Sequence, residues 1–156
     1  MEKKVIELHH FAAQRMIALV EELSADEWLA QPSGFANNIA WNVGHTLFVR
    51  QHLLYRNAGV ETGLDESFGP MYRGGTAPSD WESAPDVADL LGLFKSMTAK
   101  LTADFEEGVF EEVTFNPFEL GGVAIESLND SALFNIYHEG LHTATVNDLR
   151  DVIRGG

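Results

Sequence analysis

The sequence predicts an all-α protein: a four-helix bundle with a long loop between helices 2 and 3. Three observations predict this class. Apolar residues recur at three- and four-residue steps in four long segments, as they do on one face of a helix. A segment rich in glycine and proline separates the second of these from the third. The 156 residues, 45% of them hydrophobic, suit a single domain spanning residues 1–156, in which the helices bury their apolar faces against one another.

The first helix is expected from about Glu2 to Leu23. After it, Ser24 and Glu27 have the spacing of a capping box, which predicts a further short turn. Pro32 and Gly34 then break the chain. The periodic apolar positions of this helix are Val5, Leu8, Ala12, Met16, Leu19, Val20 and Leu23.

The second helix is expected to begin after Asn37 or Asn38, either of which can cap it, and to end at about Asn57. Residues 59–85 contain eight glycines and prolines, so no long helix fits there. We expect an extended surface connection, whose length indicates a functional part.

The third helix is predicted to begin at Ser83, with Pro85 just inside it, and to end near Phe105. Residues 108–122 alternate weakly and are punctuated by Asn-Pro and Gly-Gly, so we expect irregular, extended chain. Ser127 opens the last helix, which is expected to continue to the glycines at 155 and 156.

Composition excludes several classes of function. Ten basic residues against 24 acidic ones give a formal charge of −14, which repels nucleic acid and anionic membranes. The absence of cysteine excludes disulfides and thiolate ligands. No apolar run approaches the roughly 18 residues of a membrane span, and the charged start is unlike a signal peptide, so we expect a cytoplasmic protein.

The strongest local motif is the segment from His138 to His142. Residues four apart lie above one another on a helix, so both imidazoles can reach one ion. The alternative is that they are hydrogen-bonded core residues. Leaving two buried imidazoles without partners costs about 1 to 3 kcal/mol each, and an ion would satisfy both, which favours the ligand interpretation.

A catalytic divalent site usually has three protein ligands and one open position. His45 is the predicted third ligand, because Trp41, His45, Phe48 and His52 share one face of the second helix. Gly44 costs about 1 kcal/mol relative to alanine in a helix, which indicates a close approach by a neighbour. His52 lies roughly 10 Å further along the axis, too far to bind the same ion, and is expected in a pocket wall.

Other polar residues have less certain assignments. His9 and His10 point about 100° apart on the first helix, and a surface position is expected for both. Asn42, Asn135 and Tyr137 either orient ligands or cap helical turns, with the second role favoured. Glu139 completes a His-Glu-x-x-His motif, in which glutamate is the general base of zinc proteases, but no third protease ligand follows His142.

The motif Asn38-x-x-Trp41-x-x-Gly44-His45, followed in the last helix by His138 and His142, resembles the DinB or YfiT-like superfamily of metal-binding four-helix bundles. The resemblance implies that His45, His138 and His142 are the metal ligands. It also implies a homodimer, and an activity of the kind found among its members, which include transferases and isomerases that use low-molecular-weight thiols. Three imidazoles suit zinc best, with nickel as the second choice.

Three functional hypotheses follow. In the first, the protein is a metal-dependent transferase or isomerase, with a small thiol as cosubstrate. In the second, it is a metal-dependent hydrolase in which Glu139 is the catalytic base. In the third, the bundle binds a metal or small ligand without catalysis. A metal ion with four protein ligands and no open coordination position would favour this third hypothesis.

Overall fold

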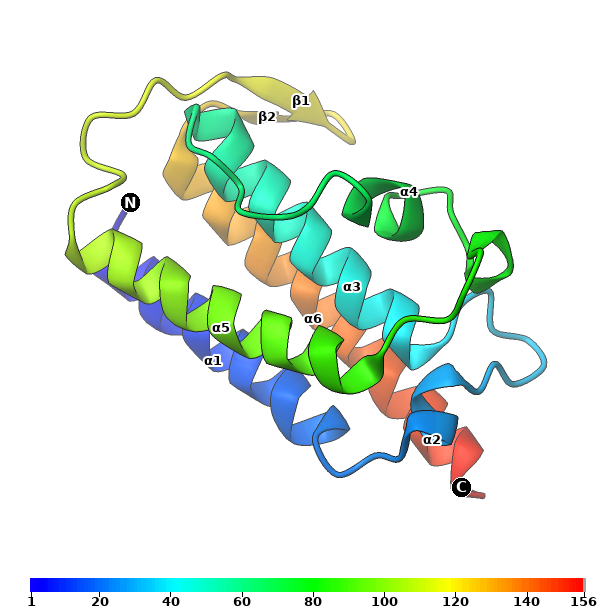
Figure 1. Cartoon of the computed structure of the whole chain (residues 1–156). Coiled ribbons are helices and arrows are strands. Elements are labelled where there is room, and N and C mark those ends of the chain that lie inside the picture. Colours follow the sequence, from blue (N-terminus) through cyan, green and yellow to red (C-terminus); the bar gives the residue numbers. More distant parts are fainter. Residues whose placement is uncertain (156) are drawn as a thin grey trace.

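The computed structural model describes residues 1–155 and shows a bundle of four long helices. These are α1 (Lys3–Val20), α3 (Ile39–Arg50), α5 (Val87–Glu106) and α6 (Leu128–Ile153). Each of α1 and α3 packs against both α5 and α6. Figure 1 shows that α1 and α6 run in one direction, and that α3 and α5 run in the other. The predicted all-α class is therefore confirmed.

The helix starts follow from capping residues. Asn38 accepts a hydrogen bond from the backbone of Trp41, which fixes the start of α3. Ser24 begins the short helix α2 (Ala25–Leu29), and Ser127 begins α6, each with a complete capping box. All three residues were predicted caps.

One predicted start is wrong. The sequence predicts that the third helix begins at Ser83, but α5 begins at Val87 with Asp86 as its cap. The Asp86 carboxylate accepts hydrogen bonds from the backbone of both Ala88 and Asp89. Asp86 therefore satisfies two free N–H groups of the first turn, and Pro85 stays outside the helix.

The second helix changes type before it ends. After α3, residues Gln51–Tyr55 form the π-helix η1 and Arg56–Ala58 the 3-10 helix η2, and Gly59 then takes a positive φ of 71°. The connection that follows contains the short helix α4 (Phe68–Tyr72), which was not predicted, and the 3-10 turn η3 (Pro78–Asp80). The connection is long because α3 and α5 are neighbours that run in the same direction (Figure 1). The chain must therefore return from the end of α3 to the opposite end of the bundle before α5 begins.

A small hairpin precedes α6. Strands β1 (Phe118–Leu120) and β2 (Val123–Ile125) pair antiparallel, where irregular chain was predicted. Gly121 and Gly122 both have positive φ, 59° and 83°, as a tight two-residue hairpin turn requires. The weakly alternating segment before Asn116 forms no strand.

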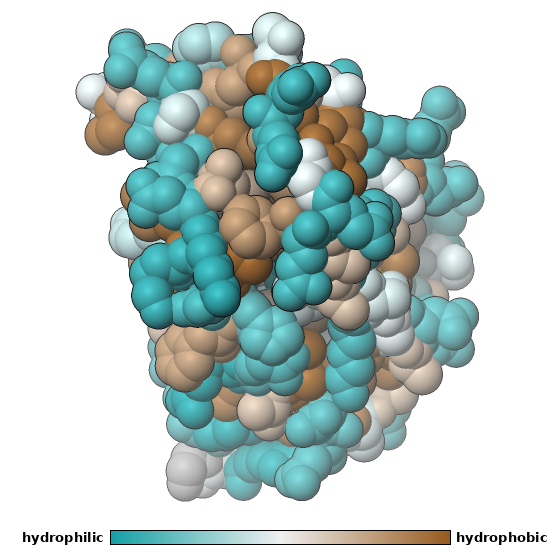
Figure 2. Space-filling model, turned by 90° about the vertical axis from the view of Figure 1, so that its left-hand side faces the viewer, coloured by the Kyte–Doolittle hydropathy of each residue, from teal (hydrophilic) through white to brown (hydrophobic). Residues whose placement is uncertain are grey.

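The core lies between the four helices. Its largest buried side chains include Trp28, Met16, Leu47 and Phe94, each at most 2% exposed. Figure 2 shows a face of the molecule on which hydrophilic side chains predominate, with apolar side chains visible between them. Among the described residues, no helix combines the length and apolar character needed to cross a membrane.

Candidate metal centre

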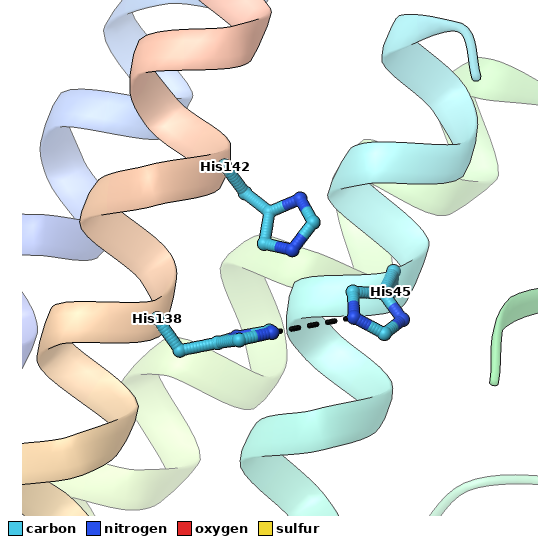
Figure 3. Close-up of side chains that lie close together, drawn as sticks. All are labelled: His45, His138 and His142. Atoms are coloured by element: carbon cyan, nitrogen blue, oxygen red, sulfur yellow. Dashed lines mark hydrogen bonds between the residues drawn. The ribbon is translucent and has the colours of Figure 1, made fainter. Parts of the chain in front are cut away.

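Three histidine side chains converge in the space between α3 and α6. His45 comes from α3, and His138 and His142 come from successive turns of α6 (Figure 3). One ring nitrogen from each lies within 4.8 Å of the others. His45 is buried and the other two are partly buried, so the cluster lies near the surface rather than in the centre of the core.

The residues before His45 place its ring. Asn38 caps α3, and Trp41, one turn later, stacks on the imidazole of His45 with ring centroids 4.5 Å apart and planes 10° apart. The indole N–H of Trp41 donates to the hydroxyl of Thr76 in the connection to α5. The stacked ring therefore restricts rotation of the imidazole, and is itself held in place.

Tyr72 holds the imidazole of His45 at its Nδ1 edge, whereas Trp41 contacts the face of the ring. The Nδ1 atom of His45 lies 2.7 Å from the backbone carbonyl of Tyr72, at the end of α4. A Cβ atom on Gly44 would lie 2.3 Å from the Tyr72 ring, so only glycine lets α4 pack this closely on α3. The close approach predicted from Gly44 is confirmed.

Asn42 orients His142. Its side-chain N–H donates to the carbonyl of Asn38, which leaves its oxygen facing His142 Nδ1 at 2.7 Å. The cap role favoured from the sequence is therefore wrong for Asn42, because its side chain bridges two helices. Such a contact fixes both the ring orientation and the tautomer of a metal ligand.

These contacts determine which ring nitrogens are free. Carbonyl oxygens only accept hydrogen bonds, so Nδ1 carries the hydrogen in both His45 and His142, and Nε2 carries the lone pair. Nε2 of His138 lies 3.3 Å from Nε2 of His45. Two nitrogen ligands about 2.1 Å from a tetrahedral ion lie about 3.4 Å apart, so the spacing of this pair fits a divalent cation.

The three imidazoles are neutral at neutral pH. Burial, together with the repulsion between neighbouring histidines, lowers the pKa of His138 to about 4 and that of His142 to about 3. Burial also lowers the pKa of His45, against the opposing effect of its hydrogen bond to Tyr72. Only a neutral imidazole has a lone pair to offer, so an ion meets little competition from protons.

Glu139 lies in the core, away from this cluster. Arg50 Nε donates to its Oε1 atom at 2.8 Å, and Asn135 Nδ2 donates to the same atom at 3.3 Å. Arg50 also donates to Thr98 on α5 and covers the ring of Phe94. Glu139 thus takes part in a buried ion pair that joins α6 to α3 and α5.

The remaining histidines differ in position. The surface position predicted for His9 is wrong: its side chain is only 1% exposed, and Asn135 donates a hydrogen bond to its Nε2 atom in the core. His10 is exposed, as predicted. His52 lies in the wall of a pocket, as expected, and Tyr137 is 61% exposed.

Sequence reasoning missed the contribution of the connection to α5. The carbonyl of Tyr72 and the hydroxyl of Thr76 both support the centre, directly or through Trp41. Every residue has a backbone carbonyl, so the sequence cannot show which carbonyl makes a contact. Gly44 was the one sequence feature that indicated a close approach to α3.

Comparison with known proteins agrees with the geometry. Residues 8–146 match the DinB superfamily, a span that includes all three histidines and the four long helices apart from their outer ends. No curated protein shows significant similarity to the chain. The match covers most of the sequence, and the chain therefore belongs to the DinB superfamily.

Proposed function

We propose that this protein binds one divalent metal ion through His45, His138 and His142 and uses it to activate a small thiol in a transfer or isomerisation reaction. The supporting observation is the convergence of three Nε2 atoms, two of them fixed by acceptors on Nδ1. Zinc is the preferred ion and nickel the second choice.

The donor set leaves one coordination position for an external ligand. Within the described residues, the cluster contains three histidines and no fourth histidine or carboxylate. A purely structural site normally has four protein ligands, so this arrangement favours binding of an exogenous molecule. An ion held there would lower the pKa of an incoming thiol and stabilise the thiolate as a nucleophile.

The residues around the centre would keep it ready for that ligand. Trp41 and Tyr72 hold His45, and Asn42 holds His142, so little reorganisation is needed when an ion binds. The hydrolase alternative has less support, because Arg50 and Asn135 bind the Glu139 carboxylate. A general base must reach the proton that it removes.

Elemental analysis tests the metal site. Wild type should contain close to one ion per chain after incubation with zinc or nickel, and His45→Ala, His138→Ala and His142→Ala should lose it. His10→Ala, a change at an exposed histidine outside the cluster, is the matched control and should keep the ion. Metal retained in the cluster variants, or absent from wild type, would contradict the proposal.

The thiol role needs a second measurement. Cobalt-loaded protein should develop a sulfur-to-cobalt absorption band when 2-mercaptoethanol is added, and the band should saturate at one thiol per ion. Cobalt-loaded protein that shows no such band with any small thiol would argue against thiol activation while leaving the metal site intact.

A further inference from the structure

A pocket of about 480 Å³ lies at the end of α3, against the α4 region. Phe48, His52 and Arg56 form one wall, and Gly69, Pro70 and Arg73 of the α4 region form another. The site described above uses none of these side chains. Its position and its charges together indicate what it binds.

The pocket and the metal centre share the same two structural elements. His52 follows His45 on one face of the helix, about 10 Å further along by helical rise, with Phe48 between them. On the other side, Tyr72 supplies the carbonyl that holds His45, and its neighbour Arg73 lines the pocket. A molecule that reaches from this pocket to the ion would therefore need to be about 10 Å long.

Cations are scarce in this protein, yet two line the pocket. The chain has ten basic residues against 24 acidic ones. Six of the ten form ion pairs within residues 1–155, but Arg56 and Arg73 are not among them. Arg56 instead donates to His52 Nε2 at 3.1 Å, which places its guanidinium at the pocket wall.

Two carboxylates face the same space. Asp65 and Glu66 line the pocket, and neither forms an ion pair with the two arginines in the described structure. A pocket with two positive and two negative side chains has no excess positive charge with which to select a simple anion. The net charge of −14 on the whole protein would also repel such an anion. It suits a ligand that carries both a carboxylate and an ammonium group.

We infer that this pocket binds the α-amino-acid head group of the thiol that the metal centre activates. The carboxylate would lie against Arg56 and Arg73, the ammonium against Asp65 and Glu66, and the sulfur would extend to the ion. This inference rests on the proposed function, and it narrows the cosubstrate to small zwitterionic thiols whose head group lies well away from the sulfur.

The test uses cobalt-loaded full-length protein and three thiols: γ-glutamylcysteine, its derivative acetylated on the glutamyl amine, and 2-mercaptoethanol. The charge-transfer band gives each dissociation constant. Wild type should bind γ-glutamylcysteine at least tenfold more tightly than either other thiol. The double variant Arg56→Gln/Arg73→Gln should lose that preference, with unchanged cobalt content and unchanged affinity for 2-mercaptoethanol.

The double variant Lys3→Gln/Arg15→Gln is the matched control, because both residues are exposed on α1, outside this pocket, and the two substitutions remove the same total charge. It should retain the full preference. Equal affinity for the three thiols, or a preference that survives in the double variant, would overturn the inference while leaving the proposed function standing. Failure of wild type to bind cobalt, or to give a band with any thiol, would overturn both.

Discussion

The side-chain oxygen of Asn42 lies 2.7 Å from Nδ1 of His142, and this contact connects the two helices that carry the histidine cluster. Asn42 also donates to the carbonyl of Asn38 at the start of α3, and this hydrogen bond fixes the orientation of the amide without any contact from α6. The α3 helix therefore contributes both a histidine of its own and the residue that sets a histidine on α6.

Replacement of Asn42 tests this role. Asn42→Ala removes the acceptor from His142 Nδ1, so the ring loses its fixed tautomer, and metal affinity should fall about 10- to 100-fold. Asn42→Asp keeps an acceptor at the same position and should retain most of the affinity. Competition with a chromogenic chelator measures both. Equal losses in the two variants would show that the hydrogen bond is not what matters.

Gly44→Ala should destabilise the fold and weaken the metal site together. The added Cβ would lie 2.3 Å from the Tyr72 ring, so α4 must move away from α3, taking the carbonyl that holds His45 with it. We expect a loss of about 1 to 3 kcal/mol in the free energy of unfolding by urea, together with weaker metal binding.

Gly140→Ala is the matched control for this change. Gly140 is also within a helix, but a Cβ there would meet no atom within 4 Å. Because alanine is the better helix former, this variant should gain up to about 1 kcal/mol. Similar behaviour of the two alanine variants would contradict the close packing of Tyr72 on Gly44.

The buried pair between Arg50 and Glu139 should be important for stability and not for metal binding. Arg50→Met leaves the Glu139 carboxylate without its main partner, at a cost of about 3 to 5 kcal/mol in the free energy of unfolding. Lys95→Met breaks the exposed pair with Glu21 and should cost less than about 1 kcal/mol. Glu139→Gln should keep a stoichiometric ion, as measured by elemental analysis.

His9 should make the metal-free protein sensitive to acid. Burial lowers the pKa of His9 to about 4. The unfolded chain, with an ordinary pKa near 6.5, therefore binds more protons between these two values, and stability falls as the pH falls through this window. The loss should be on the order of 3 kcal/mol.

The variant His9→Gln isolates this contribution. Urea unfolding in chelator, repeated from pH 7 to pH 4, should show a steeper decline for wild type than for His9→Gln. His10→Gln keeps the buried residue and should follow wild type. Parallel curves for wild type and His9→Gln would mean that His9 is protonated without disturbing the core.

Metal removal should lower thermal stability, because an ion that binds only the folded state stabilises it. At a free ion concentration one hundred times the dissociation constant, the gain is about 2.7 kcal/mol. A chelator should therefore reduce the melting temperature of metal-loaded wild type and leave that of His142→Ala unchanged. An equal response from both proteins would assign the effect to another site.

The fold class and the pair His138 and His142 could be predicted from local signals in the sequence, whereas His45 was predicted from its helix face and from the family resemblance. Asn38 and Ser127 mark helix starts, and the four-residue spacing of His138 and His142 identifies one face of a helix. The burial of His9 could not be predicted. It depends on Asn135, which reaches His9 only because α1 and α6 pack side by side.

The hairpin and α4 were also missed, for related reasons. Each is short and has little intrinsic stability without tertiary contacts. Tyr72 is only 2% exposed, and it packs on Gly44 of a helix far away in the sequence. The burial of this ring, rather than helix propensity, keeps α4 in place. Sequence periodicity contains no information of that kind.

The long connection between α3 and α5 has two roles: its first part lines the pocket, and its later part holds His45 and Trp41. All three clustered histidines are on regular helices, whereas Asp65, Glu66 and Arg73 belong to the connection or to the end of α4. Substitutions within residues 59–67 would therefore alter the pocket wall and leave in place the helices that carry the histidines. Evolution could thus adapt such a bundle to a new small molecule without rebuilding the residues that hold the ion.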